Sequence, residues 1–155
     1  MNEAEILNAK ILIVDDAEAN LKLLEDLLAR EGFHQVISTA DSTRALDLFK
    51  AFEPDLILLD LMMPELDGYA VLEMLSRHIP SDEYLPVLVL TADATIGAKR
   101  KALALGAKDF LTKPFDTIEA MLRVWNLLET RMLYRHLKSL NARIKPVHHT
   151  NTASE

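Results

Sequence analysis

Asp55-Leu56-Ile57-Leu58-Leu59-Asp60 has the pattern of a short strand buried on both faces, because a continuous apolar run lies between polar residues. The run is too short to cross a membrane as a helix. Pro64 and the pair Asp67-Gly68 follow closely and favour a loop over a direct continuation into a helix. We therefore expect Asp60 at the carboxyl end of a buried strand, on the edge of the sheet where α/β proteins bind ligands.

Four other segments repeat this arrangement of an apolar run followed by a helical pattern. The strand candidates lie at residues 11–14, 36–37, 85–90 and 110–111, and the helices between strands end at Gly32, Pro54, Pro80 and Gly106. Asp41, Asp67 and Asp116 precede three helices, where a carboxylate can accept hydrogen bonds from free backbone amides. Strict alternation of strands and helices predicts parallel strands joined by right-handed crossovers in a three-layer α/β domain.

The apolar content of the strands predicts their order in the sheet. Residues 11–14, 56–59 and 85–90 are the most continuously apolar and are expected at the centre, whereas residues 36–37 and 110–111 suit the edges. This arrangement corresponds to the order 2-1-3-4-5 of the flavodoxin-like (βα)5 fold, a doubly wound parallel sheet. We therefore expect one α/β domain of this fold with an extended C-terminal helix.

The last helix is longer than a sheet of this size requires. From Asp116 to about Asn141 it would span roughly 40 Å, at ~1.5 Å per residue. Its first part can cover the sheet with five apolar residues: Ile118, Met121, Leu122, Trp125 and Leu128. Beyond them a coiled-coil-like stripe continues at spacings of 4, 3 and 4: Leu133, Leu137, Leu140 and Ile144.

These patterns divide the chain into three parts. Residues 8–128 form the α/β domain, and residues 129–145 form a helical extension that could act as a coiled-coil linker or a dimerisation helix. Residues 146–155 are polar and are expected to be disordered. The alternative for the extension is a frayed helix end that carries a few leucines, because two heptads are a short repeat.

Composition and charge exclude several classes of protein. The chain has 155 residues, of which 50% are hydrophobic, and it has no cysteine, which excludes disulfides, thiolate metal sites and cysteine nucleophiles. Its N-terminus is acidic, unlike a secretory signal, and no apolar run is long enough for a membrane span, so we expect a cytoplasmic protein. The net charge of −7 disfavours nonspecific nucleic-acid binding, although residues 121–149 carry six basic side chains against Glu129 alone.

Polar residues with a common chemistry follow four of the predicted strands. Asp15 and Asp16 follow the first, Asp60 the third, Thr91 the fourth and Lys113 the fifth. In the inferred order these strand ends meet at one edge, where clustered carboxylates without histidine or cysteine favour Mg²⁺. A carboxylate beside such an ion can attack phosphorus, and a hydroxyl and an ammonium can hold phosphate oxygens.

The sequence resembles the receiver domain of two-component response regulators from roughly Lys10 to Leu128. The matching motifs are Ile13-Val14-Asp15-Asp16, Leu59-Asp60-Leu61-Met62-Met63-Pro64 with Asp67-Gly68, Leu90-Thr91-Ala92, Gly106-Ala107, and Asp109-Phe110-Leu111-Thr112-Lys113-Pro114-Phe115. The resemblance implies that Asp60 is the phosphoacceptor, fed by a histidine kinase or a histidine phosphotransfer protein. Such a protein catalyses only its own phosphorylation and dephosphorylation.

The resemblance also implies roles for the residues around Asp60. Asp16, Asp60 and the backbone carbonyl of Met62 would ligate Mg²⁺, with Mn²⁺ as a substitute, and Asp15 would act largely through bound water. Lys113 would pair with the phosphate. The bond between Lys113 and Pro114 would be cis, which is accessible because residue 114 is proline.

A second set of residues would report and time the phosphorylated state. Thr91 and the neighbouring Ala92 would contact the phosphate, and Phe110 occupies the family's aromatic switch position. Through them phosphorylation would change the surface of the fourth helix, fifth strand and fifth helix of the (βα)5 unit. Met62 and Asp93 lie two residues after Asp60 and Thr91 and are expected to tune hydrolysis.

Other functions account less well for these residues. A haloacid-dehalogenase-like phosphatase also uses a strand-end aspartate with Mg²⁺, but it needs a second aspartate where this chain has Met62. A dinucleotide-binding domain would need Gly-x-Gly-x-x-Gly after the first strand, and that motif is absent. We expect the N-terminal part of a larger regulator with an enzymatic or DNA-binding output domain; a complete stand-alone receiver that acts by binding a partner is the alternative.

Overall fold

The computed structural model describes residues 2–63 and 67–153, with side chains in the last helix described as far as Arg143. Five parallel strands form one sheet in the order β2-β1-β3-β4-β5, which confirms the predicted flavodoxin-like topology. The strands are β1 (Lys10–Val14), β2 (Gln35–Thr39), β3 (Leu56–Asp60), β4 (Val87–Thr91) and β5 (Asp109–Thr112). Pro64, which was expected to favour a loop after the third strand, lies outside the described residues.

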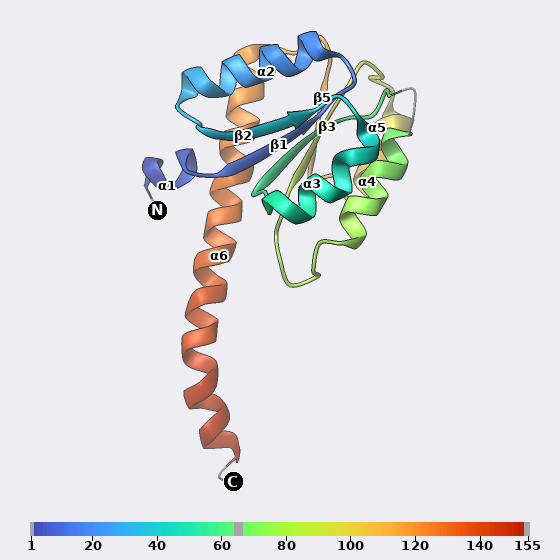
Figure 1. Cartoon of the computed structure of the whole chain (residues 1–155). Helices are drawn as coiled ribbons and strands as arrows, with labels where there is room; N and C mark the ends of the chain where they lie inside the picture. Colours follow the sequence, from blue (N-terminus) through green and yellow to red (C-terminus); the bar gives the residue numbers. More distant parts are fainter. Residues whose placement is uncertain (1, 64–66, 154–155) are drawn as a thin grey trace.

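Helices cover both faces of the sheet (Figure 1). They are α1 (Glu3–Leu7), α2 (Glu18–Glu31), α3 (Ala45–Phe52) after a 3-10 turn (Ser42–Arg44), α4 (Gly68–Arg77), α5 (Ile96–Ala104) and α6 (Thr117–Ala153). Side chains of α2 and α6 share one buried cluster, and α3, α4 and α5 contribute to the other. Asp41, Asp67 and Asp116 accept backbone hydrogen bonds at the starts of helical segments, as predicted.

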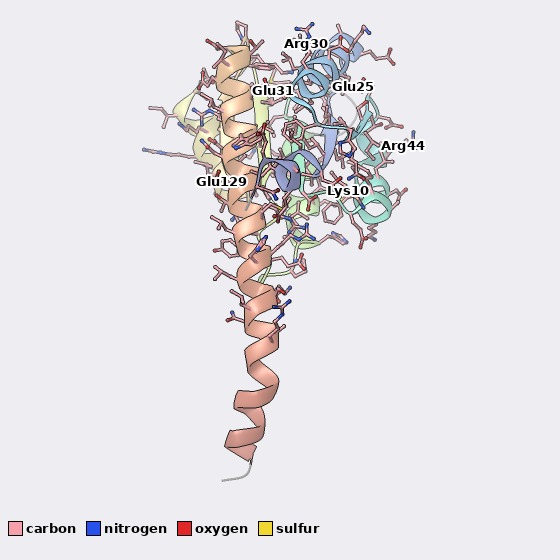
Figure 2. The ribbon with its side chains drawn as sticks, turned by 90° about the vertical axis from the view of Figure 1, so that its left-hand side faces the viewer. Lys10, Glu25, Arg30, Glu31, Arg44 and Glu129 are labelled. Carbon is pink, nitrogen blue, oxygen red and sulfur yellow. The ribbon has the colours of Figure 1, made fainter. Side chains whose placement is uncertain are left out.

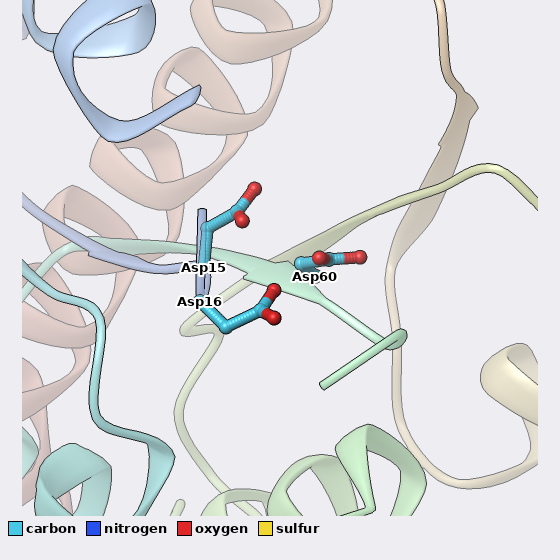
Figure 3. A group of neighbouring side chains, drawn as sticks. All are labelled: Asp15, Asp16 and Asp60. Carbon is cyan, nitrogen blue, oxygen red and sulfur yellow. The ribbon is translucent and has the colours of Figure 1, made fainter. Parts of the chain in front are cut away.

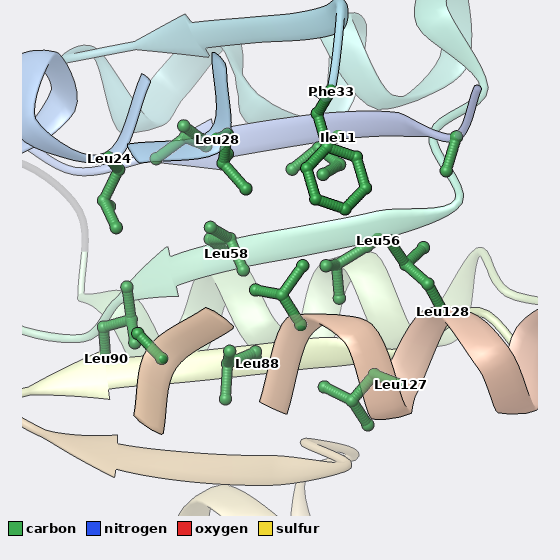
Figure 4. Close-up of a cluster of buried hydrophobic side chains, with 14 of the residues drawn as sticks. Ile11, Leu24, Leu28, Phe33, Leu56, Leu58, Leu88, Leu90, Leu127 and Leu128 are labelled. Carbon is green, nitrogen blue, oxygen red and sulfur yellow. The ribbon is translucent and has the colours of Figure 1, made fainter. Parts of the chain in front are cut away.

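The burial of the strands explains their order. All residues of β3 and β4 are buried, and in β1 only Lys10 is partly exposed, so these three strands need cover on both faces. Strands β2 and β5 are partly exposed and occupy the edges. Figure 4 shows the core on one face, where Leu58 and Leu88 of the central strands lie near Leu24 of α2 and Leu127 of α6.

Two elements differ from the sequence-based expectation. The helix α1 precedes the expected domain start at residue 8, and its Ile6 is buried with 3% of its surface exposed. The helix α6 continues to Ala153, whereas an end near Asn141 was expected. The expected disorder of residues 146–155 stays a prediction, and residues 154–155 lie outside the described residues. The expected end followed the end of the leucine stripe, whereas the observed helix extends beyond it and through Pro146, a residue of poor helix propensity.

Within the described residues, no helix is both long enough and apolar enough to cross a lipid bilayer.

Candidate functional site

The carboxylates of Asp15, Asp16 and Asp60 meet at the carboxyl ends of β1 and β3, as the strand order predicted. Each can offer an oxygen that lies within 4.8 Å of an oxygen of the other two. Figure 3 shows the three side chains together at the carboxyl ends of the two strands. Asp15 and Asp60 are buried, and Asp16 is exposed at the rim. Adjacent parallel strands bring these groups together because their carboxyl ends lie on one edge of the sheet.

Lys113 reaches this cluster from the residue after β5. Its Nζ lies 2.8 Å from Oδ2 of Asp15 and 3.4 Å from Oδ2 of Asp60. The backbone N–H of Lys113 donates to the carbonyl oxygen of Thr91 at 2.7 Å, and the bond from Lys113 to Pro114 is cis, as predicted. One ammonium group is therefore shared by two buried carboxylates.

Backbone amides in the loops orient the buried carboxylates. The N–H of Met62 donates to Oδ1 of Asp60 at 3.1 Å, and the N–H of Ala17 donates to Oδ1 of Asp15 at 3.0 Å. Burial raises the pKa of Asp60, and it outweighs the lowering effects of the Met62 amide and the Lys113 charge. The carboxylate of Asp60 is thus held in place but poorly solvated, which favours bond formation with an electrophile that enters the site.

The two amide donors were not expected from the sequence, although a carboxylate commonly accepts a hydrogen bond from the amide two residues later. Nor does the sequence indicate that Lys113 lies closer to Asp15 than to Asp60. The distances from Lys113 to the two carboxylates depend on how the ends of β1, β3 and β5 pack together. No local sequence pattern predicts such distances.

Thr91, the last residue of β4, and Asp93 in the loop that follows lie at the carboxyl end of the next strand of the sheet. Thr91 is fully buried, and its hydroxyl oxygen accepts a hydrogen bond from the N–H of Asp93 at 3.3 Å. Asp93 in turn accepts from the N–H of Thr95 at 3.0 Å, and hydrogen bonds from Thr95 lower the pKa of Asp93. Ala92, between them in the sequence, is exposed.

Phe110 and Met62 occupy opposite environments. Phe110 lies in β5 opposite Val89 of β4 and is buried, with 6% of its surface exposed. Met62 is 60% exposed in the loop after Asp60. The Phe110 ring is therefore buried beside the strand that carries Thr91, whereas the Met62 side chain is exposed to solvent.

The donor set fits a hard divalent cation. Three carboxylates with a single ammonium leave an excess of negative charge, and within the described residues this is the one acidic cluster with the geometry to hold a metal. Oxygen ligands without nitrogen or sulfur favour Mg²⁺ or Mn²⁺ over zinc or copper. The residues present therefore fit the Mg²⁺ that the sequence implied.

The fold and the strand-end residues together define an α/β domain of flavodoxin-like topology with an acidic, lysine-containing site. Residues 11–124 match the family model described as the response regulator receiver domain. The chain therefore belongs to the response regulator receiver domain family, as the sequence motifs indicated.

Relatives and solved structures agree with this assignment. The chain is 38% identical over 136 residues to the response regulator PleD of Caulobacter vibrioides. This match covers 88% of this chain and 30% of PleD. It is 41% identical over 122 residues to the alkaline phosphatase synthesis transcriptional regulatory protein PhoP of Bacillus subtilis, covering 79% of this chain and 49% of PhoP. A putative response regulator from Chloroflexus aurantiacus superposes with a TM-score of 0.71 at 35% identity, covering 79% of this chain and 98% of that one.

NtrX from Brucella abortus superposes with a TM-score of 0.77 at 32% identity, covering 86% of this chain but 29% of NtrX. The chain thus spans between about a third and a half of the two curated relatives described above. Both of these relatives are regulators that extend beyond the region matched here.

Proposed function

We propose that this chain is a phosphorylation-activated signalling receiver in which Asp60 accepts a phosphoryl group from a histidine kinase or a histidine phosphotransfer protein. The observation that carries this proposal is the pair of buried carboxylates, Asp15 and Asp60, that share the ammonium group of Lys113 beside the exposed Asp16. The site combines a poorly solvated nucleophile, Asp60, with the ammonium group of Lys113, which can pair with the phosphoryl group after transfer.

In the proposed reaction a carboxylate oxygen of Asp60 forms a bond to phosphorus. The bond from phosphorus to the donor's histidine nitrogen breaks, and its electron pair stays on that nitrogen. Lys113 then turns its charge toward the new phosphate oxygens, and the hydroxyl of Thr91 donates to one of them. Water later hydrolyses the acyl phosphate, which returns the carboxylate and releases inorganic phosphate.

Asp15, Asp16 and Asp60, with the backbone carbonyl of Met62, would hold Mg²⁺, or Mn²⁺ as a substitute. When bound, the ion would offset the negative charge that the carboxylates and the incoming phosphoryl group share. The close approach of the three carboxylates supports this proposal, because the single positive charge of Lys113 does not balance their negative charge.

Phosphorylation adds about −1.5 to −2 charges, and we propose that Thr91 moves toward them. Phe110 would then occupy the space that Thr91 leaves, and the surface of α5, β5 and α6 would change. This surface corresponds to the fourth helix, fifth strand and fifth helix of the (βα)5 unit. Met62 and Asp93 would set the lifetime of the phosphorylated state from their positions near the entrance.

For the output, we favour the N-terminal part of a larger cytoplasmic regulator with an enzymatic or DNA-binding domain. The longer relatives support this, and PhoP is named as a transcriptional regulator. A stand-alone receiver that binds its target directly is the second candidate. The exposed residues Leu133, Leu137 and Leu140 favour a second copy of the chain as a partner of α6, while the side chain of Ile144 lies outside the described residues.

A haloacid-dehalogenase-like phosphatase is not supported. The family match and the relatives described above are those of response regulators, and Met62 stands where that class needs its second aspartate.

The test is reaction of the full chain with acetyl phosphate and Mg²⁺, followed by intact-mass measurement. We expect the parent chain to gain one phosphoryl group and Asp60→Asn to gain none. Asp67→Asn is the matched control, because Asp67 is an exposed helix cap outside the site. Equal modification of the parent and Asp60→Asn would rule out Asp60 as the acceptor.

A further inference from the structure

A third buried carboxylate, Asp55, lies at the amino end of β3, the opposite end of that strand from Asp60. Asp55 directly precedes β3, the strand that ends in Asp60, and its side chain is 10% exposed. Its Oδ2 accepts from the backbone N–H of Lys10 at 2.9 Å. Its Oδ1 accepts from Nε of Arg131 at 3.2 Å and from Nη1 of Arg135 at 3.3 Å. Two arginines one helical turn apart on α6 therefore bind the amino end of the central strand.

The segment before β4 makes further contacts with the same part of α6. The rings of Tyr84 and Tyr134 stack with centroids 5.1 Å apart, and Nη1 of Arg131 donates to the carbonyl oxygen of Tyr84 at 3.0 Å. Lys138 Nζ lies 3.3 Å from a carboxylate oxygen of Asp82 and 3.2 Å from one of Glu83. These contacts line a cavity of about 320 Å³ between the segment and the helix.

The N-terminal helix α1 holds α6 from another side. Nε2 of His136 lies 2.7 Å from Oε1 of Glu5. Ile6 of α1 is buried in the same cluster as Leu128 and Met132 of α6. Figure 2 shows α1 lying against α6 near the labelled Glu129, above the part of the helix that extends away from the domain.

We propose that α1, Asp55 and residues 82–84 form a clamp that fixes the direction of α6, so that the rigid receiver ends near Lys138 rather than near Leu128. Three chain segments far apart in the sequence contact residues 131–138 of the helix. The exposed ion pairs are individually weak, but Asp55 is buried and needs its cationic partners. The clamp would thereby fix the direction in which α6 exposes Leu133, Leu137 and Leu140. The helix α6 would then be a rigid extension of the receiver rather than a flexible linker.

The absence of native cysteine allows a direct measurement of this direction in the full chain. Spin labels on Asp47→Cys in α3 and Asn141→Cys in α6, both exposed positions, report the distance between the domain and the helix. Excess unlabelled chain suppresses distances between copies. The clamp predicts a narrow distance distribution for the labelled parent, because α6 has one direction.

The clamp variant combines Tyr134→Ala, Arg135→Ala, His136→Ala and Lys138→Glu, all at exposed positions on α6, so the receiver core is retained. We expect its distance distribution to widen or shift. The matched control replaces the exposed Leu133, Leu137 and Leu140 of the same turns with alanine and should retain the parent distribution. A broad distribution in the parent, or an unchanged one in the clamp variant, would overturn the proposal.

Discussion

The ammonium nitrogen of Lys113 lies 2.8 Å from a carboxylate oxygen of Asp15, whose side chain is 1% exposed. Replacing Lys113 with alanine leaves this buried charge without its cation, so we expect a loss of about 3–5 kcal/mol in the free energy of unfolding in metal-free buffer. Urea denaturation measures the loss, and added Mg²⁺ should restore part of it. Lys99→Ala, at an exposed position on α5, should have little effect; equal stability of the two variants would contradict the prediction.

Asp60→Asn should stabilise the metal-free protein at neutral pH, because burial raises the pKa of Asp60 in the folded state. The folded protein favours the protonated form of Asp60. The parent therefore loses stability relative to Asp60→Asn as the pH rises from the unfolded-state pKa of Asp60, about 3.9, through its raised folded-state pKa. Below both pKa values this difference vanishes. Urea denaturation across pH measures it, and a parent that gained relative stability with rising pH would contradict the sign.

Asp93→Asn is an informative control for that experiment, because hydrogen bonds from Thr95 lower the pKa of Asp93. The folded protein favours the charged form of Asp93. The parent is therefore expected to be more stable than Asp93→Asn above the unfolded-state pKa of Asp93. It should be lost as pH falls through the lowered folded value. The stability difference between parent and variant should therefore change with pH in opposite directions for Asp60→Asn and Asp93→Asn.

Met62→Asn should accelerate autodephosphorylation. Met62 is 60% exposed near Asp60, and its thioether is a weak acceptor, whereas an amide can both donate to and accept from a hydrolytic water. Decay of the phosphorylated chain, followed by intact mass after removal of acetyl phosphate, measures the rate. Leu23→Asn, an exposed position on α2, controls for a surface amide, and an unchanged rate in Met62→Asn would remove Met62 from this role.

The residues of the acidic site were predictable because each follows an apolar run, and strand order alone brings the strand ends together. Asp15, Asp60, Thr91 and Lys113 required no knowledge of packing. The role of Asp55 was not predictable in this way, because its partners Arg131 and Arg135 lie 76 and 80 residues later and on a helix whose rotation is set by packing. The helix α1 was missed because five residues carry little periodicity.

Two glycines should respond to alanine in opposite directions. A Cβ at Gly68 would lie 2.3 Å from Cα of Leu61, so the backbone beside Asp60 must shift, and we expect a cost of about 1–3 kcal/mol. A Cβ at Gly97, the second residue of α5, meets nothing within 4 Å, so alanine there should stabilise the helix, by no more than the roughly 0.5–1 kcal/mol of a mid-helix position. Urea denaturation distinguishes the two, and equal effects would refute the steric argument.

Truncation tests how much of α6 belongs to the receiver. A chain that ends at Leu128 loses Met132, which is 2% exposed, and both arginines that bind Asp55, so we expect a loss of at least about 3 kcal/mol. A chain that ends at Asn141 keeps these contacts and should match the parent. Fluorescence of Trp125, the single tryptophan, follows urea unfolding in both chains.

The same truncation can isolate the contribution of Asp55. In the chain that ends at Leu128, Asp55→Asn should recover part of the lost stability, because a neutral amide does not need a cationic partner. In the parent the same substitution should be destabilising, because it weakens the contacts with Arg131 and Arg135. This reversal of sign is a coupling between Asp55 and the helix that a double-mutant cycle measures. Equal effects of Asp55→Asn in both chains would mean that Asp55 is not energetically coupled to the arginines of α6.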